Sequence, residues 1–549
     1  MIELDIRGSQ IAISFPYSDE TVRRVKHLTY DFRKADRYWL VSCSRLEEIY
    51  AIFPDAVPTT KMREWIELQR TLARIKDDSN GYTPFWVGCE LLDHQKSALA
   101  YLVNFSHCAN FDPPGSGKTR VAAGWAMKRG LPALVACPAS VKYHWRREIL
   151  LCNPGAKVGM LAGKPRFDLG DLGISTDCQW IICNWEILKS WVKYIAKFSV
   201  QPVSLIADEA QSAKAGDRSQ CGTAILRLAE AAPNVHYMTG SPVLNRTQEI
   251  EPTLIALQKL TPRERFAWRV RFCDGKRICI NEMGVKYHHK EPQYRWSFKG
   301  STNTELLERE LETFSVRRPD SVIQKSLPET THTLLELDLP NMAPHNKLFR
   351  EMRALKFSQD PVARGKALAL IGQMLAWAGA EKAPQVAELL QARLDVGESA
   401  IVFSDFLAPL AALRPYFPDR SLLIDGSVPQ AQRDALIAAI DRPTVVLAGR
   451  KAIGTGTDGL QHKMRLVYFV TLCWNSEAWA QAWKRVRRQG QTRPVEVITT
   501  LARGTAEEAV LRILYEKAKV TDILCSSPAL SDEARGDWES VLSLLGGLS

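Results

Sequence analysis

Several features that would assign a chain to a secreted, membrane or zinc-binding class are missing from this 549-residue sequence. No apolar run approaches the roughly 20 residues that a membrane-spanning helix requires. The opening stretch, Met1 to Asp5, has neither a basic segment nor a long apolar core, so we expect no signal peptide. The 12 cysteines contain no Cys-x-x-Cys pair, which argues against a zinc ribbon or a disulfide framework and fits a reducing compartment. The histidines, His288 and His289 included, lack metal-ligand spacing, and we interpret them as structural or surface residues.

Acidic residues are in the minority. The chain has 61 Asp and Glu against 72 Lys and Arg, a formal net charge of +11, with a pI near 9.0. This balance favours a polyanionic partner such as nucleic acid, although ordinary basic enzymes share it. With this length and a hydrophobic content of 46%, the chain can bury several cores, and we expect about three or four domains.

The most informative stretch runs from Phe111 to Thr119 and reads FDPPGSGKT. It follows a short apolar run and opens a helical run over 120–129, and a strand, a glycine loop and a helix start in that order form a phosphate cradle. Lys118 would reach the β- and γ-phosphates, and the Thr119 hydroxyl would ligate Mg²⁺. The residues assigned to the nucleotide here are Asp112, Gly115, Ser116, Gly117, Lys118 and Thr119.

A glutamine precedes this loop. Gln95 stands in the string LLDHQ, ahead of a helix expected over 96–103. Its amide can bond both the donor and the acceptor edge of adenine, which would select ATP over GTP.

Apolar strands alternate with helical segments beyond the loop. We expect strands at 133–137, 180–183, 203–207 and 235–238, each apolar on both faces, as a buried parallel sheet requires. Polar segments follow these strands and should converge at the carboxyl edge of the sheet. After the third strand, Asp208 would hold Mg²⁺ and Glu209 would orient the attacking water. The segments are Pro138-Ala139-Ser140, Asn184-Trp185-Glu186, Asp208-Glu209-Ala210-Gln211 and Thr239-Gly240-Ser241-Pro242.

In combination these motifs resemble the Swi/Snf-type translocases of helicase superfamily two. That family also carries Asp at the first loop position, where Asp112 stands, and Gln211 replaces a residue that is often His. The resemblance implies nucleotide contacts from Gln211 and Gly456. It also implies DNA contacts from Pro138, Ala139, Ser140, Asn184, Thr239, Gly240 and Trp474, with Gly456 as a further candidate.

A second series of strands follows a helical stretch at 341–393. Strands are expected at 401–403, 422–424, 445–447, 467–470 and 495–498. No second phosphate loop appears in the sequence, so this lobe needs a partner lobe to make a site.

The second lobe carries the string QAWKRVRRQGQ at 481–491, which resembles the family's QAxDRxHRxGQ box. Arg485 and Arg488 occupy its two arginine positions, and such arginines supply roughly 10³- to 10⁵-fold in rate. Lys484 and Arg487 depart from the family's Asp and His.

Residues 1–57 predict a small α+β domain. Phe15-Pro16-Tyr17, Tyr30-Asp31 and Trp39-Leu40-Val41 resemble the HARP domain of annealing helicases, which grips branched DNA. An unrelated small α/β cap is the alternative.

A basic and aromatic insertion spans 263–299, with ten Lys and Arg against four Asp and Glu. It could track a phosphate backbone and stack on bases. A solvated arm with its own small core is the alternative.

The expected fold class is α/β, with two tandem RecA-like P-loop lobes, helical insertions and a small N-terminal α+β domain. The expected boundaries are 1–57 for the HARP-like domain, 58–85 for a linker helix, 86–255 for the ATP-binding lobe, 256–393 for the arm, insertion and inter-lobe linker, 394–525 for the second lobe and 526–549 for a tail.

The predicted function is ATP-dependent translocation on double-stranded DNA, with ATP and Mg²⁺ as cofactors and duplex or branched DNA as a partner bound without regard to sequence. The first choice for the task of this motor is fork remodelling or strand annealing in replication and repair. Displacement of proteins from DNA and conventional strand separation are alternatives. A non-catalytic scaffold is disfavoured by Lys118, Glu209 and Arg488. We expect a monomer without membrane contact, single-strand-binding or replication proteins as further partners, and a cytoplasmic, nucleoid-associated location in a bacterial or phage-infected cell.

Overall fold

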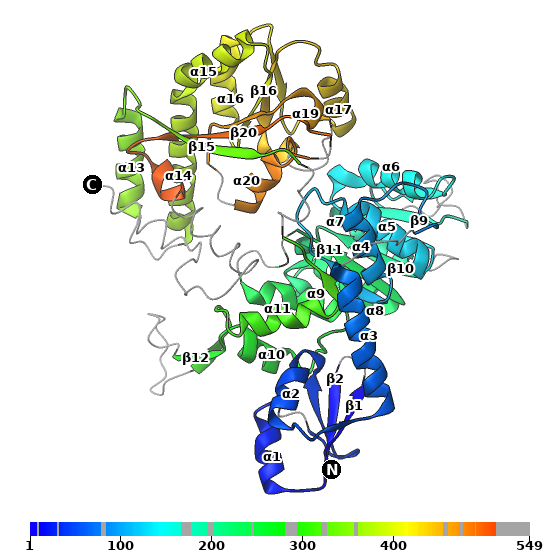
Figure 1. Ribbon diagram of the computed structural model, residues 1–549. Helices are drawn as coiled ribbons and strands as arrows, with labels where there is room; N and C mark the ends of the chain where they lie inside the picture. Colours follow the sequence, from blue (N-terminus) through cyan, green and yellow to red (C-terminus); the bar gives the residue numbers. More distant parts are fainter. Residues whose placement is uncertain are drawn as a thin grey trace. The chain divides into compact units, whose positions relative to one another are not determined.

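The computed structural model divides into two compact α/β units (Figure 1). The first comprises 1–112, 117–137 and 145–318, and the second comprises 113–116, 138–144 and 319–549. The structure describes all residues except 8–9, 30–31, 78–83, 166–176, 196–201, 241, 243–245, 280–293, 320–326, 356–360, 454–458, 473–475, 489 and 512–549.

The chain opens with a five-stranded sheet of order β3-β4-β2-β1-β5. Alternating apolar residues bury one face of it, among them Leu4, Ile13 and Trp39. The predicted first hairpin is confirmed, with Arg7 paired to Gln10. The elements are β1 (Glu3–Arg7), β2 (Gln10–Ser14), α1 (Asp19–Lys26), β3 (Phe32–Arg33), β4 (Tyr38–Ser42), α2 (Leu46–Ile52), β5 (Val57–Pro58) and the predicted linker helix α3 (Thr60–Asp77). Tyr30 and Asp31 of the HARP-like motif lie outside the described residues.

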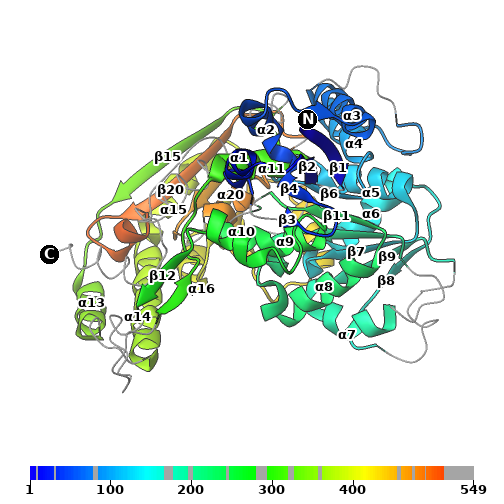
Figure 2. The same ribbon diagram turned by 90° about the horizontal axis from the view of Figure 1, so that it is seen from below.

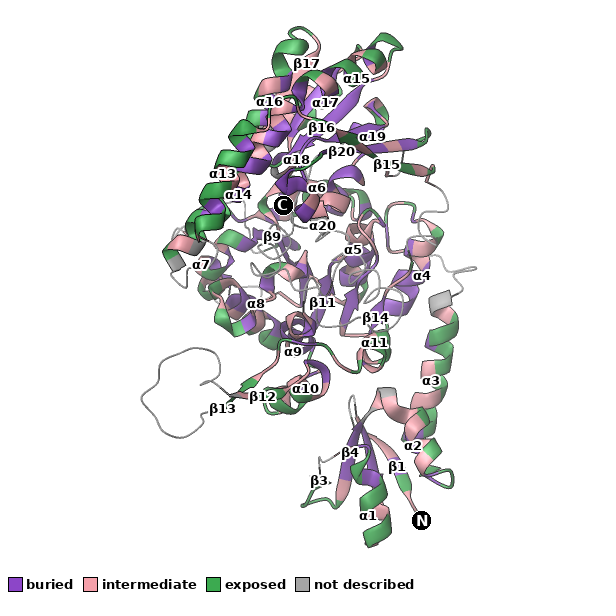
Figure 3. Ribbon diagram, turned by 90° about the vertical axis from the view of Figure 1, so that its left-hand side faces the viewer, coloured by how far each residue is buried: buried purple, intermediate pink, exposed green. Residues whose placement is uncertain are grey.

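A seven-stranded parallel sheet of order β14-β6-β11-β10-β7-β9-β8 organises the rest of the first unit. The four predicted strands are confirmed as β7 (Ala133–Cys137), β9 (Trp180–Asn184), β10 (Ser204–Asp208) and β11 (Asn234–Met238). All their residues are buried, as the lack of alternation predicted (Figure 3). The strand predicted before the phosphate loop is β6 (His107–Asn110). The sequence did not predict the short edge strands β8 (Val158–Met160) and β14 (Ser315–Val316).

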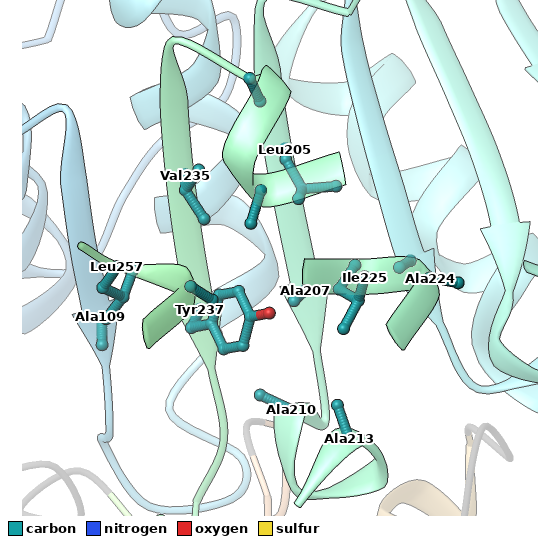
Figure 4. Close-up of a cluster of buried hydrophobic side chains, with 14 of the residues drawn as sticks. Ala109, Leu205, Ala207, Ala210, Ala213, Ala224, Ile225, Val235, Tyr237 and Leu257 are labelled. Atoms are coloured by element: carbon teal, nitrogen blue, oxygen red, sulfur yellow. The ribbon is translucent and has the colours of Figure 1, made fainter. Parts of the chain in front are cut away.

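Helices cover both faces of this sheet. Figure 2 shows α4 (Asp93–Leu102) and α5 (Lys118–Arg129) on one side of the labelled strands, with α7 (Trp185–Ile195) and α8 (Gln220–Ala231) on the other. In Figure 4, side chains of β10, β11 and α8 meet in one buried cluster that includes Leu205, Tyr237 and Ile225. The remaining helices are α6 (Lys142–Cys152), α9 (Glu251–Ala256), α10 (Arg265–Phe272) and α11 (Thr304–Glu312).

The second unit is built on a six-stranded sheet of order β15-β20-β19-β16-β18-β17, again parallel throughout. Five strands match the prediction: β16 (Ala400–Ser404), β17 (Ser421–Ile424), β18 (Val445–Gly449), β19 (Leu466–Phe469) and β20 (Val495–Ala502). The sequence did not predict β15 (Thr330–Leu337), an edge strand that pairs with β20 along its whole length and is largely exposed. None of the residues in its string, TTHTLLEL, is fully buried, so the string lacks the apolar pattern that identifies a strand.

Helices again lie on both sides of the sheet. One core contains residues of α15 (Ala383–Asp395) and α16 (Leu407–Leu413), and the other contains residues of α17 (Gln430–Ala438), α19 (Leu460–Lys463) and α20 (Ser476–Trp483). The predicted class, α/β with two RecA-like lobes, is confirmed. The remaining helices are α13 (Ala343–Leu355), α14 (Pro361–Glu381) and α18 (Arg450–Ile453).

Two sequence interpretations fall outside the described residues. These are the tail over 526–549 and the pair His288 and His289, none of whose residues the structure describes. Among the helices that the structure describes, none has both the length and the apolar character to cross a bilayer.

A fully buried ion pair stabilises the second unit. Lys382 lies between α14 and α15, and its Nζ donates to both oxygens of Glu507, at 2.9 and 2.8 Å, and to the carbonyl of Thr500 at 2.9 Å. Glu507 Oε2 also accepts from the Ala502 amide at 2.8 Å. Burial lowers the pKa of Lys382 and raises the pKa of Glu507, while each partner's charge opposes that change. The pair thus ties the helical layer to the end of β20.

We expect Lys382→Met to lower the free energy of unfolding by about 3–5 kcal/mol, because it leaves the Glu507 charge buried without its partner. Urea unfolding followed by circular dichroism measures this change. The double variant K382M/E507L removes both charges and should recover most of the loss. A double variant less stable than K382M would contradict the assignment.

Candidate nucleotide-binding site

The phosphate loop connects β6 to α5, as predicted. Gly115 and Gly117 adopt left-handed backbone conformations, with φ of 86° and 76°. A Cβ on Gly117 would lie 2.0 Å from Gln95 Nε2, so a side chain there would displace the Gln95 amide and would also strain the left-handed backbone. Lys118 begins α5, and its Nζ donates to the carbonyl of Asp112 at 2.7 Å. The loop therefore presents glycine backbone and one lysine at the start of a helix, which fits a phosphate chain.

Gln95 packs beside this loop. Its side chain is buried, and its Oε1 accepts from the backbone amide of Leu92 at 3.0 Å at the start of α4. The structure thus confirms that Gln95 and the loop are neighbours, while recognition of adenine stays a prediction.

Asp112 has a role that the sequence did not predict. Its carboxylate is buried and forms an ion pair with Arg318, which follows β14. The Arg318 backbone amide and Nε donate to Asp112 Oδ1 at 3.1 and 3.2 Å, and Nη1 donates to Ser97 Oγ at 2.8 Å. Arg318 therefore fixes the first residue of the loop to helix α4. No local pattern relates Asp112 to an arginine about two hundred residues away.

The predicted acidic pair lies at the end of β10. Trp145 Nε1 donates to Asp208 Oδ2 at 2.7 Å, and Trp185 Nε1 donates to the Asp208 carbonyl at 2.9 Å. Burial, followed by the charge of Glu209, raises the pKa of Asp208 to about 7, while the Trp145 hydrogen bond and the charge of Lys118 oppose the rise. A bound divalent cation would stabilise the charged form of this buried carboxylate, so Asp208 fits the predicted Mg²⁺ role.

A chain of hydrogen bonds holds the second carboxylate. Glu209 has a left-handed backbone, with φ of 51°, which is uncommon for a residue other than glycine and marks strain. Gln211 Nε2 donates to Glu209 Oε2 at 2.6 Å, and Thr239 Oγ1 donates to Gln211 Oε1 at 2.6 Å. Gln211 therefore positions Glu209 and connects β10 to the end of β11.

No group of three or more His, Cys, Asp and Glu side chains gathers as a metal site in the part of the chain that the structure describes. The candidates for a cation at the phosphate loop remain Thr119 and Asp208.

The arginine box lies in the second unit, just after α20. Val486 is buried in the core, while Arg485 and Arg488 are half-buried. Arg487, at the family's His position, donates from Nε to the Pro328 carbonyl at 2.8 Å and so ties the box to the chain entering β15. Lys484 Nζ lies 5.7 Å from the centroid of the Trp483 ring. The approach of Arg485 and Arg488 to the phosphate loop stays a prediction.

The predicted DNA contacts follow the strands of the first sheet. Pro138, Ala139 and Ser140 lie in the turn after β7, and Gly240 follows β11. Asn184 Nδ2 donates to Glu186 Oε2 at 2.6 Å, so this side chain is engaged within the protein, as that of Thr239 is through Gln211. Gly456 and Trp474 lie outside the described residues.

We expect Asp208→Asn to stabilise the metal-free chain more at pH 8 than at pH 5. The folded pKa, about 7, lies above the usual value of 3.8, so the folded state binds the proton more tightly than the unfolded state. The associated stability is complete below about pH 4 and is lost as pH rises through 7. The expected gain at pH 8 is on the order of 2–4 kcal/mol, measured by unfolding in EDTA. The control is the variant D55N, because Asp55 is exposed and its substitution should change stability equally at the two pH values. An equal effect of D208N at both pH values would contradict the prediction.

We expect Arg318→Ala to lower the free energy of unfolding of the first unit by about 3–5 kcal/mol, because the Asp112 carboxylate stays buried without its partner. Thermal unfolding followed by circular dichroism measures the loss. The neighbouring variant R317A, with the same change in charge, is the control, and equal stability of the two variants would refute the Asp112–Arg318 coupling.

The chain is similar to known proteins over most of its length. The family model described as "SNF2-related domain" matches residues 33–380. The chain is 25% identical over 462 residues to the DNA annealing helicase and endonuclease ZRANB3 of Mus musculus, which covers 80% of this chain and 41% of that protein. It is 25% identical over 545 residues to the SWI/SNF-related matrix-associated actin-dependent regulator of chromatin subfamily A-like protein 1 of Bos taurus. This match covers 94% of this chain and 54% of that protein.

Among solved structures, the Sulfolobus solfataricus SWI2/SNF2 ATPase core in complex with dsDNA is 18% identical, with a TM-score of 0.38, and covers 81% of this chain and 95% of that chain. The chain therefore spans only 41% and 54% of the two curated relatives named above. The range matched by the family model includes both the phosphate loop and the acidic end of β10, and the chain belongs to the SNF2-related domain family.

Proposed function

We propose that the chain uses ATP hydrolysis to translocate along double-stranded DNA. One observation carries the proposal. At the end of β10, the Asp208 carboxylate lies within the electrostatic reach of the phosphate-loop lysine, and a hydrogen-bonded chain from Thr239 through Gln211 holds the carboxylate of the next residue, Glu209. This arrangement serves phosphoryl transfer, which depends on positioned charge more than on covalent chemistry.

The roles of the residues follow from their contacts. Lys118 and the backbone of Gly115 to Thr119 would bind the phosphates, and Thr119 and Asp208 would hold Mg²⁺. The chemistry that Mg²⁺ supplies when bound is neutralisation of phosphate charge. Glu209 would accept a hydrogen bond from the attacking water and orient it, with its carboxylate fixed by Gln211. Trp145 keeps the Asp208 carboxylate in place through its indole N–H.

Motion would come from the second lobe. We propose that Arg485 and Arg488 reach the γ-phosphate when the two lobes close, and that closing and reopening move the DNA stepwise. Contacts from the strand-end segments to phosphates would make binding independent of sequence and sensitive to salt. A monomeric state and a cytoplasmic, nucleoid-associated location belong to the same proposal.

The proposed task is fork remodelling or strand annealing. It is supported by the HARP-like pattern of the N-terminal domain and by the similarity to a relative that is named a DNA annealing helicase and endonuclease. The β3–β4 hairpin of that domain exposes Lys34 and Arg37, which would face a branched substrate. Displacement of proteins from DNA and strand separation remain the alternatives.

We expect Lys118→Ala and Glu209→Gln each to lower the duplex-stimulated ATPase rate by at least about 100-fold, since each removes charge stabilisation or water positioning at the phosphoryl group. Phosphate release with and without plain duplex measures the rates, and duplex affinity without nucleotide should stay within about threefold of the parent. Parent-like hydrolysis by K118A would sink the catalytic assignment.

A second prediction separates fork remodelling from plain translocation. The variant K34A/R37A should raise the concentration of forked DNA needed for half-maximal ATPase by roughly tenfold, because two phosphate-facing cations are lost, while plain duplex should stimulate as before. The variant R23A/K26A removes two exposed cations from α1 of the same domain and is the matched control. If both double variants respond to forks as the parent does, the role of this hairpin is refuted.

A further inference from the structure

Helix α10 carries large apolar side chains on two opposite sides. Trp268 and Phe272 are 7% and 1% exposed and join the core of the first lobe. Phe266 and Val270, spaced four apart on the other side, are 52% and 36% exposed. A helix on a protein surface normally has one apolar stripe, so the outward side of α10 calls for a different explanation.

A two-stranded ribbon extends this outward side. Strands β12 (Lys276–Cys279) and β13 (Tyr294–Ser297) pair antiparallel, with Arg277 opposite Trp296. Trp296 and Phe298 stack with ring centroids 6.1 Å apart and an interplanar angle of 7°, and Phe266 meets both rings edge-on at 5.2 and 5.8 Å. Phe266, Trp296 and Phe298 therefore form one continuous ring cluster, and Tyr294 lies on the same strand two residues from Trp296.

This cluster is open rather than a closed core. Tyr294 and Trp296 are 53% and 42% exposed, and Figure 3 shows β12 and α10 with exposed residues along them. Arg277 lies 5.0 Å from the centroid of the Tyr294 ring. Phe298 is partly buried against the core of the first lobe, so the cluster is packed on that side and exposed at Tyr294 and Trp296. A core alone does not require the two exposed rings.

The charge around the cluster is strongly positive. The described parts of the insertion, 263–279 and 294–299, hold eight Lys and Arg against two Asp and Glu. Arg265 and Arg269 pair with buried Glu251. In contrast, Arg263, Arg277, Arg295 and Lys299 make no ion pair with any residue that the structure describes. Cations without an ion-pair partner among the described residues, one of them over the exposed Tyr294 ring, favour a polyanionic ligand with flat faces.

Hydrogen bonds and close backbone packing hold the ends of the ribbon against α10. Thr302 Oγ1 donates to the Arg271 carbonyl at 2.7 Å, and the Thr302 amide donates to the Phe272 carbonyl at 3.0 Å. A Cβ on Gly275 would lie 2.7 Å from Val270 Cα, so the turn between α10 and the ribbon requires glycine for close packing. A surface held in this way loses little conformational freedom when a ligand binds.

We propose that this surface, made by Phe266, Arg277, Tyr294, Trp296 and Phe298, binds an unpaired segment of DNA by stacking bases on its rings. Bases in a duplex already stack on one another, so only an unpaired strand offers ring faces to the protein. The choice of DNA over RNA rests on the proposed function. At a fork, such a surface would retain a displaced strand while the motor acts on the duplex.

The test uses the full chain and fluorescein-labelled oligo(dT) of about 20 nucleotides, longer than the roughly 4–16 nucleotides of common single-strand sites. Fluorescence anisotropy without nucleotide gives the Kd. Trp296→Ala and Tyr294→Ala should each weaken binding by roughly tenfold, while W296F should stay within about threefold, because stacking needs a ring. Arg277→Ala should reduce the slope of log affinity against log salt by about 0.7, and R277K should retain it.

Matched controls make each result decisive. Tyr416 is 49% exposed in the second unit, and Y416A should bind oligo(dT) as the parent does. Thermal unfolding identifies any variant that fails to fold, and Tyr294, whose ring is the most exposed of the ribbon, supplies the variant least coupled to folding. Parent-like affinity of folded Y294A and R277A would overturn the proposal. Tighter binding of oligo(rU) than of oligo(dT) would overturn the choice of DNA.

The outcome is separable from that of the proposed function. ATPase stimulation by plain duplex reports the motor, and W296A and Y294A should leave it unchanged. Normal duplex stimulation with unaltered oligo(dT) binding in both variants refutes the stacking surface alone. Absent duplex stimulation in the parent refutes the motor, whatever the oligo(dT) result.

Discussion

Burial of charge at the carboxyl edge of the seven-stranded sheet is the constraint on which the first unit depends. Asp112 follows β6 and Asp208 ends β10, with β11 between the two strands, and each carboxylate is largely removed from water. Such groups are tolerated when they are paired or hydrogen-bonded, or when they await a cation. Arg318 neutralises the first, and Trp145 holds the second. The cost of burying the Asp112 carboxylate is therefore offset by an ion pair with an arginine. The cost of burying the Asp208 carboxylate is offset only in part, by a hydrogen bond from a neutral indole.

This difference separates a structural role from a chemical one. The Asp112–Arg318 pair links the phosphate loop to α4 and to the chain leaving β14, so the loop has a fixed base. Asp208 instead has a raised pKa, the mark of a site arranged for function at the expense of stability. The left-handed backbone of Glu209 adds strain at the same point. The buried cluster in Figure 4 includes Ala207 and Ala210, which flank the acidic pair in the chain, and its packing stabilises the strand end that carries this strain.

The insertion over 263–299 likewise contains residues that stabilise the fold and residues that remain available for binding. Helix α10 anchors itself by Trp268 and Phe272, and that anchor leaves Phe266 and the β12–β13 ribbon to face solvent. Its arginines divide likewise, because Arg269 neutralises buried Glu251 while Arg277 lies over an exposed ring. A fold that commits only part of its aromatic and basic residues to stability leaves the remainder for binding.

The sequence by itself determined the two parallel sheets, the phosphate loop and the acidic strand end, because apolar runs without alternation and glycine spacing are local signals. It did not reveal β15, β14 or β8, since short or exposed edge strands have no buried face to create a pattern. The Asp112–Arg318 pair, the tryptophan hydrogen bonds to Asp208 and the burial of one side of α10 arise between segments far apart in the chain. Only tertiary packing decided them, because each contact depends on which strands become neighbours in a sheet.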